Sequence, residues 1–295
     1  MFTRQKYLIA YLSAAGGQCS HIQLDKGLFW LSKEKLKTNI YDFHPYLFGP
    51  FSETLYLDLR TLGEKGLLAQ DKENVWLRTS QQQNKKFLDK IPSEDFYEIT
   101  LIASEFAKMS FNKTLEKVYT AYPYFAINNP NYKNRFRKHD PRLRLENKTA
   151  KIFTIGYEGI SIDEFLNQLI RNNIHILVDV RNNPHSMKYG FSEKKLESIC
   201  GRHGIEYLSI RNLGIVSDKR QMLETAEDYK KLFADFEKNH MPKVSEELGQ
   251  LQQLLEGGKR IALMCFEKDI SCCHREVVGR HLYHFSEAKY GLQHL

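Results

Sequence analysis

The chain has 295 residues, which is enough for two hydrophobic cores, because single cores usually stop growing at about 250–300 residues. Apolar residues make up 42% and charged residues 27%, a mix that excludes a disordered or fibrous protein. No apolar stretch reaches the roughly 18 residues that a membrane helix needs, and Met1 leads directly into an amphipathic pattern instead of a signal peptide. We therefore expect a cytoplasmic, two-domain protein that does not contact a membrane.

Five cysteines occur in the chain, an odd number at wide spacing: Cys19, Cys200, Cys265, Cys272 and Cys273. Without a secretory context, such a pattern indicates reduced thiols instead of a disulfide framework.

The first 80 residues predict three helices and a hairpin. Residues 5–14 carry apolar side chains at helical spacing, and Ser20 and Ser52 are candidate N-caps of two further helices. Residues 67–70 and 74–78 flank a polar turn, which predicts two paired strands. Residues 1–80 therefore resemble a winged-helix domain. This fold is used mostly for DNA binding and sometimes only for contact with other proteins.

The candidate recognition helix, residues 52–62, has a weakly charged face for a DNA reader. We expect Glu53, Asp58 and Glu64 to be exposed beside Arg60. DNA binding and protein docking both stay open for this domain. The pattern of residues 43–52 also resembles modules found beside bacterial toxin, antitoxin and defence domains.

Residues 81–127 form a predicted helical segment, and residues 128–150 form a basic linker. Between Pro130 and Lys151 there are eight basic residues against two acidic ones. Aromatic residues interleave with the cations, a pattern that suits a polynucleotide, although a solvated linker is the alternative. The candidate nucleic-acid-binding residues are Lys133, Arg135, Arg137, Lys138, Arg142 and Arg144. The expected partner is DNA or RNA.

Residues 151–295 alternate between predicted strands and helices. Apolar runs at 152–155, 175–180, 205–210 and 260–265 predict strands, and apolar stripes after Ser161, near Leu196 and over 248–255 and 276–283 predict helices. This alternation predicts an α/β domain whose mostly parallel sheet has helices on both faces.

Polar residues follow these strands, so we expect them to meet at the carboxyl edge of the sheet, where ligands bind in such folds. The loop 265–275 ends at a helix N-terminus, which favours an anion and is expected to lower the pKa of a thiol. The predicted anion-binding residues are Tyr157, Glu158, Arg181, Ser186, His274 and Arg275. The predicted catalytic residues are Asp179, Cys265, Glu267 and Cys273, with Asp179 or Glu267 as the general base. A simple ion pair between Asp179 and Arg181 is the structural alternative.

Residues 152–285 resemble the family known as domain of unknown function 488. The motifs that carry the resemblance are residues 154–159, 178–181 with Pro184 and Ser186, 213–214, 264–267 and 273–275. The resemblance implies a compact α/β domain of bacteria and archaea in which these residues line a shared pocket, and it implies no particular reaction.

Our leading hypothesis is a nucleic-acid-associated enzyme whose pocket binds a phosphate, a nucleotide or an extruded base and hydrolyses a phosphoester or N-glycosidic bond, with a role in bacterial defence. A DNA-binding regulator that senses a small anionic ligand is a non-enzymatic alternative. Thiol chemistry, as in a sulfurtransferase or phosphatase, is another, although no cation stands about six residues after Cys265. A zinc site that adds Cys200 and His203 to the loop matches no common ligand spacing, so we predict no metal and no cofactor. The oligomeric state stays open.

Overall fold

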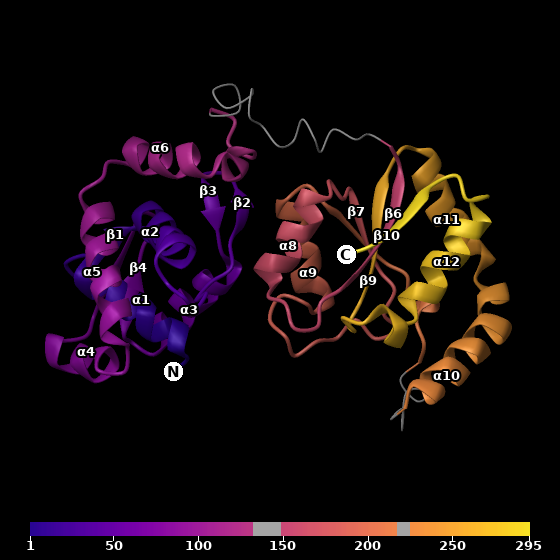
Figure 1. Ribbon diagram of the computed structural model, residues 1–295, viewed down its shortest axis with the longest axis horizontal. Helices are drawn as coiled ribbons and strands as arrows, with labels where there is room; N and C mark the ends of the chain where they lie inside the picture. Colours follow the sequence, from indigo (N-terminus) through magenta and orange to yellow (C-terminus); the bar gives the residue numbers. More distant parts are fainter. Residues whose placement is uncertain (132–148, 217–224) are drawn as a thin grey trace. The chain divides into compact units, whose positions relative to one another are not determined.

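The computed structural model describes residues 1–131, 149–216 and 225–295 and divides the chain into two units, Met1–Leu143 and Arg144–Leu295 (Figure 1). The six predicted nucleic-acid-binding residues, from Lys133 to Arg144, lie outside the described residues. Among the helices in the described ranges, none is both long and apolar enough to cross a bilayer.

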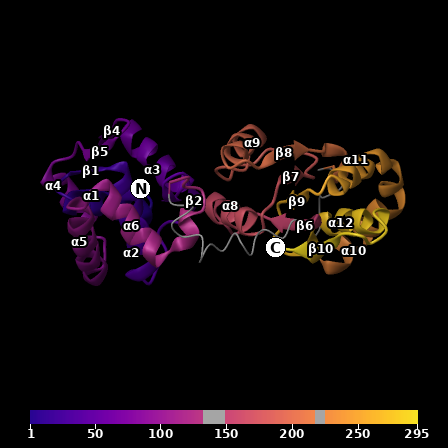
Figure 2. The same ribbon diagram turned by 90° about the horizontal axis from the view of Figure 1, so that it is seen from above.

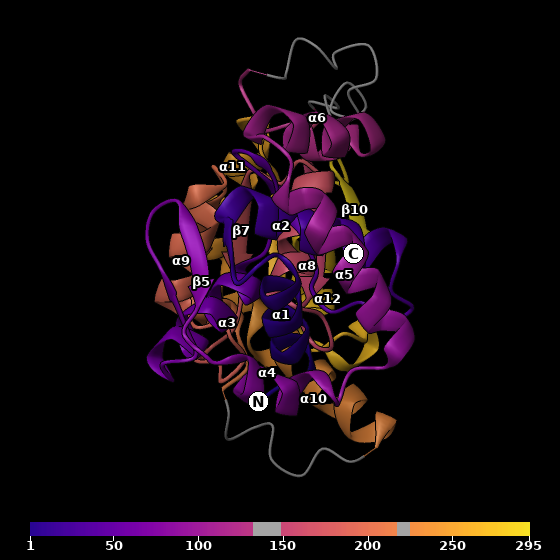
Figure 3. The same ribbon diagram turned by 90° about the vertical axis from the view of Figure 1, so that its left-hand side faces the viewer.

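The described part of the N-terminal unit contains six α-helices and two small antiparallel sheets. Its elements are α1 (Thr3–Ala14), β1 (Gln18–Ser20), α2 (His21–Glu34), β2 (His44–Tyr46), β3 (Gly49–Phe51), α3 (Glu53–Glu64), β4 (Leu68–Gln70), β5 (Asn74–Leu77), α4 (Gln81–Leu88), α5 (Ser93–Ala107) and α6 (Phe111–Ala121). The strands form a sheet in the order β1-β5-β4 and a hairpin of β2 and β3. Helix α5 packs against α1 and α2 (Figure 3), so one apolar core extends from Tyr7 to Ala126.

The predicted starts of two helices are confirmed by their caps. The Oγ atom of Ser20 accepts a hydrogen bond from the backbone of Gln23, and that of Ser52 accepts one from Leu55. These bonds satisfy donors that the first turn of a helix leaves unpaired. The helical and hairpin elements of residues 1–80 are present, and the winged-helix resemblance itself stays a prediction.

The expected acidic face of α3 is wrong in two positions. Asp58 is 1% exposed and accepts hydrogen bonds from Arg4, Gln5 and Tyr41, so it belongs to the interior. Glu53 is also buried. The helical period alone did not distinguish Asp58 from a surface carboxylate, because its partners lie elsewhere in the chain.

The C-terminal unit is the predicted α/β domain with an entirely parallel five-stranded sheet. Its elements are β6 (Lys151–Gly156), α8 (Ile162–Arg171), β7 (Ile176–Asp179), α9 (Glu193–Arg202), β8 (Glu206–Ser209), α10 (Ala226–Asn239), α11 (Ser245–Glu256), β9 (Arg260–Cys265), α12 (Arg275–Phe285) and β10 (Gly291–His294). The strand order is β10-β6-β9-β7-β8.

The strand order explains why helices cover both faces. The chain moves toward one edge from β6 to β8 and returns toward the other from β8 to β10. Because parallel crossovers are right-handed, this reversal places the later helices on the opposite face. Accordingly, α8 and α9 lie on one side of the sheet and α10, α11 and α12 on the other (Figure 2), each side with its own apolar core.

Two elements of this unit were not predicted. Helix α10 carries apolar residues at 229, 232, 233 and 236, a helical spacing that was available in the sequence. Strand β10 is short and partly polar, and its local sequence does not indicate that it pairs with β6.

Candidate functional site

The predicted convergence at the carboxyl edge of the sheet is present as a pocket. Its volume is about 360 Å³, and it lies where β6, β7 and β9 end. The residues that line it are Tyr157, Arg181, Asn182, Asn183, His185, Ser186, Met187, Ile215, Cys265, Phe266, Glu267 and His274. A pocket of this size accommodates a small ligand, since such sites usually measure roughly 300–1,000 Å³.

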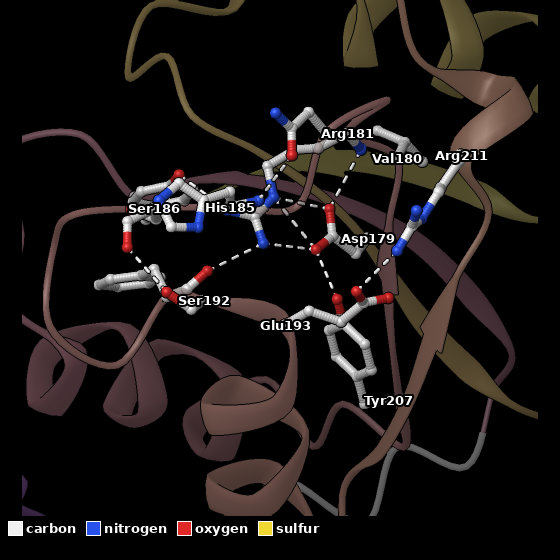
Figure 4. Close-up of polar contacts among 12 residues, drawn as sticks. Asp179, Val180, Arg181, His185, Ser186, Ser192, Glu193, Tyr207 and Arg211 are labelled. Carbon is white, nitrogen blue, oxygen red and sulfur yellow. Dashed lines mark hydrogen bonds and ion pairs between the residues drawn. The ribbon is translucent and has the colours of Figure 1, made fainter.

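Beside the pocket lies a buried ion pair between Asp179 and Arg181, of which only Arg181 lines the pocket (Figure 4). Arg181 Nε lies 2.8 Å from Asp179 Oδ1, and Arg181 Nη2 lies 2.6 Å from Asp179 Oδ2. The hydroxyl of Tyr207 donates to Asp179 Oδ2 at 2.6 Å. Arg181 also donates to the Tyr157 hydroxyl at 2.8 Å and to the Phe191 carbonyl at 2.9 Å. The network therefore joins the ends of β6 and β7 to Tyr207 in β8.

These contacts change the pKa values of the groups involved. Burial alone would lower the pKa of Arg181, but its hydrogen bonds to Asp179 and the charge of that carboxylate hold the pKa above its ordinary value. Burial raises the pKa of Tyr207, and the charge of Asp179 raises it further. Arg181 and Tyr207 therefore keep their protons and remain donors to Asp179.

The predicted role of Asp179 as a general base is corrected by this geometry. The carboxylate is fully buried, and both of its oxygens accept hydrogen bonds from Arg181 or Tyr207. A base must reach the proton that it removes, and Asp179 does not line the pocket. Asp179 instead forms the simple ion pair with Arg181 that was the alternative prediction.

A second group, formed by Cys265, Glu267 and His274, occupies one wall of the pocket. Cys265 Sγ lies 3.2 Å from Glu267 Oε2 and 3.7 Å from His274 Nδ1. His274 Nε2 lies 2.9 Å from the carbonyl oxygen of Val180, which only accepts hydrogen bonds, so this nitrogen carries a proton. In a neutral ring, Nδ1 then presents its lone pair to Cys265.

Cys273 lies behind this wall and differs from the prediction. Its side chain is fully buried, and burial raises the pKa of its thiol well above the ordinary value, with a further rise from Cys265. The expectation that the start of α12 lowers this pKa is therefore wrong, because desolvation outweighs the helix end. The adjacent Cys272 is partly exposed and contacts Ser271 instead.

Arg275 stabilises the loop and does not face the pocket. It is 1% exposed, and its guanidinium donates to the carbonyl oxygens of Glu267 and Lys268. Glu158 has a similar role, because its carboxylate accepts a hydrogen bond from the Lys268 backbone at 2.9 Å. Neither residue lines the pocket, so their assignment to an anion site is corrected.

The remaining predicted residues are at the pocket. Tyr157, Arg181, Ser186 and His274 line it, although most of the donors of Arg181 are already engaged. Ser186 lies in the loop after β7, where its carbonyl accepts from Ser192 at 2.7 Å (Figure 4). The lining residues that were not among the predicted site residues are Asn182, Asn183, His185, Met187, Ile215 and Phe266. Four of them lie in the loop after β7, at the edge of the sheet where polar residues were expected to meet.

Comparison with known proteins supports the resemblance stated above. Residues 161–282 match the model of the family described as Domain of unknown function DUF488. The match begins just before α8 and ends within α12, so it includes β7, β8 and β9 and most of the pocket. No curated protein and no solved structure matches the chain.

Proposed function

We propose that the C-terminal unit is an enzyme that hydrolyses a phosphoester or N-glycosidic bond of a nucleotide or nucleic acid in the pocket at the ends of β6, β7 and β9. The observation that carries the proposal is the position of Glu267. Its half-buried carboxylate lines the pocket beside His274 and Cys265, where a water molecule and a bound substrate have access to it. Glu267 takes the role of general base that Asp179 does not fill.

The other walls of the pocket carry an aromatic ring and amide side chains, which supports a nucleotide-sized substrate. Phe266 is 43% exposed and lies edge-on to Tyr157, with ring centroids 5.3 Å apart. Exposed aromatic faces stack on nucleobases, and the amides of Asn182 and Asn183 offer both donors and acceptors to a base or sugar.

The basic linker of residues 128–150 supports a polymeric substrate. Its cations would bind phosphates along the backbone, which makes the affinity depend on salt. Replacing Arg135, Arg137 and Lys138 with alanine is expected to lower the affinity for an oligonucleotide at low salt and to reduce the slope of log affinity against log salt by up to about 3. Lys230→Ala with Lys231→Ala, which replaces two exposed lysines on α10, is the control.

The hydrolytic proposal is tested by incubating the full chain with nucleotides and with single- and double-stranded oligonucleotides of DNA and RNA. Chromatography then detects free phosphate, free base or shortened strands. Turnover by the wild type that is lost in Glu267→Gln supports the proposal. Saturable binding without any product overturns it and favours the regulator that senses an anionic ligand.

Thiol chemistry is the second candidate because Cys265 Sγ lies 3.7 Å from His274 Nδ1. In this reaction His274 accepts the thiol proton and Cys265 attacks the substrate. A covalent adduct on Cys265 after incubation with a thiosulfate or phosphoester donor, detected by intact-mass spectrometry and absent from Cys265→Ser, would support this candidate.

A further inference from the structure

The geometry points to a zinc ion held by Cys265, Cys273 and His274, with a fourth coordination position on the side of Glu267 and the pocket. Metal binding stands independently of the proposed hydrolysis, whereas its use in activating water rests on that function. The sequence spacing did not predict the site, because the loop between residues 265 and 273 brings the ligands together in space.

The distances fit tetrahedral coordination. One ligand atom from each of the three residues lies within 4.8 Å of the other two. Zinc bonds of about 2.3 Å to sulfur and about 2.0 Å to nitrogen place a sulfur and a nitrogen ligand about 3.5 Å apart in a tetrahedron. The observed distance from Cys265 Sγ to His274 Nδ1 is 3.7 Å. The ligands would therefore need little movement to close on the ion.

The surroundings of His274 also suit a ligand. Its Nε2 donates to the Val180 carbonyl at 2.9 Å, which fixes the ring and directs Nδ1 toward Cys265. Metal-bound histidines generally donate their second nitrogen to such an outer partner. The hydrogen bond thus selects the tautomer that coordination requires.

The donor set favours zinc over other common ions. Two thiolates and an imidazole are soft ligands, whereas magnesium and calcium prefer oxygen. All three side chains are at most 1% exposed, and a divalent cation would neutralise two thiolates that are otherwise costly to bury. With three protein ligands, the fourth position is available for water, as in catalytic zinc sites.

Glu267 is placed to use that water. Its Oε2 lies 3.2 Å from Cys265 Sγ, and its side chain lines the pocket. Glu267 would take a proton from the bound water, the hydroxide would form the new bond to the phosphorus or anomeric carbon, and the leaving group would depart with that proton. Two cysteines and one histidine with a glutamate that is not a ligand also activate water in nucleobase deaminases.

The experiment measures metal by mass spectrometry in the full chain, purified under reducing conditions and freed of any affinity tag. About one zinc per chain is expected in the wild type, either as purified or after zinc has been added and the excess removed. Loss of a residue that only hydrogen-bonds to a metal ligand usually lowers metal affinity by roughly 10–100-fold. Cys273→Ser and His274→Ala remove a ligand itself, so each should lower the affinity for zinc by more than that. Cys272→Ser, with the neighbouring thiol outside the cluster, is the matched control and should retain zinc.

Cobalt titration of the wild type provides a readout that does not depend on folding of the variants. An absorption spectrum of tetrahedral cobalt with thiolate ligands is expected. The inference is overturned if the wild type binds neither ion, if Cys265 and Cys273 are recovered as a disulfide without metal, or if Cys272→Ser loses zinc as Cys273→Ser does. Zinc binding without hydrolysis would leave the inference intact and contradict the proposed function, and hydrolysis by a protein that binds no zinc would do the reverse.

Discussion

Gly156 and Glu267 approach each other so closely that a Cβ atom at position 156 would lie 1.9 Å from the carbonyl oxygen of Glu267. The same carbonyl accepts a hydrogen bond from Arg275. The end of β6, the loop after β9 and the start of α12 are thus held together at a point where only a glycine fits. The contact holds the backbone of Glu267, a residue that lines the pocket.

Gly156→Ala is therefore expected to displace the loop and to destabilise the C-terminal unit by about 1–3 kcal/mol, the usual cost of forcing an extra methyl group into a packed site. Circular dichroism during denaturation measures this change. Gly249→Ala is the control, because a Cβ at that position on α11 meets no atom within 4 Å. A Gly156→Ala protein as stable as this control would contradict the close packing.

Breaking the buried ion pair between Asp179 and Arg181 should cost far more stability than breaking an ion pair on the surface. Asp179→Asn leaves the guanidinium of Arg181 buried without its counter-charge, and we expect a loss of about 3–5 kcal/mol in the free energy of unfolding. The control is Glu193→Gln, which removes the partner of the 57% exposed Arg211 (Figure 4) and should cost at most about 1 kcal/mol.

A double variant separates buried charge from lost packing in this pair. Asp179→Leu with Arg181→Met removes both charges, so it should be more stable than Asp179→Asn. If the double variant is the less stable protein, the hydrogen bonds of the pair to Tyr157, Phe191 and Tyr207 contribute more than the charge pairing does.

The stability of the N-terminal unit should depend on Asp25. Burial raises the pKa of this carboxyl to about 6, although Lys26, His21 and Tyr56 partly offset the effect. The folded state therefore holds the proton more tightly than the unfolded state does. The resulting stability is fully present below the ordinary pKa of 3.8 and is lost as the pH rises through about 6.

The difference in stability between the wild type and Asp25→Asn measures this effect. The wild type should lose on the order of 2 kcal/mol relative to the variant between pH 4 and 6.5. Both tryptophans of the chain, Trp30 and Trp76, lie in the N-terminal unit, so their fluorescence during denaturation reports on this unit. A difference that does not change over this pH range would refute the prediction.

Phe266 should contribute to substrate binding through stacking. Phe266→Ala is expected to weaken the binding of a nucleotide by about 1–3 kcal/mol, the range observed for loss of an aromatic contact with a base. Isothermal calorimetry measures the affinity. Phe285→Ala, which alters a phenylalanine of similar exposure at the end of α12, should leave it unchanged.

Glu267→Gln should lower the turnover number by about 10²–10⁴-fold, as expected for loss of a general base. Glu246→Gln, an exposed carboxylate in the first turn of α11, is the matched control. Equal turnover in the two variants would remove Glu267 from the mechanism. The zinc content of Glu267→Gln distinguishes a lost base from a damaged metal site, because the base is not among the three ligands.

Much of the fold was predictable because its signals are local. The caps at Ser20, Ser52 and Ser161 and the apolar runs of β6, β7 and β9 specify where elements begin and which of them are buried. The edge of the sheet at which polar residues meet followed from the alternation of strands and helices.

The roles of individual side chains were less predictable because they depend on contacts between distant segments. The sequence places Arg275 at a helix start, but its direction is determined by the carbonyls of the loop at residues 267–268. Likewise, the nearness of Cys265 to Cys273 depends on the path of a short loop that spacing does not specify.

Strand β10 is an edge strand of the sheet and pairs with β6, which lies about 140 residues earlier in the chain. During synthesis on the ribosome, β6 therefore emerges long before its neighbours on either side, β9 and β10, are available. Its apolar, unpaired edges are exposed to other nascent chains throughout that interval. We expect chaperone binding to this segment, and the yield of folded protein should respond to translation speed downstream of residue 156.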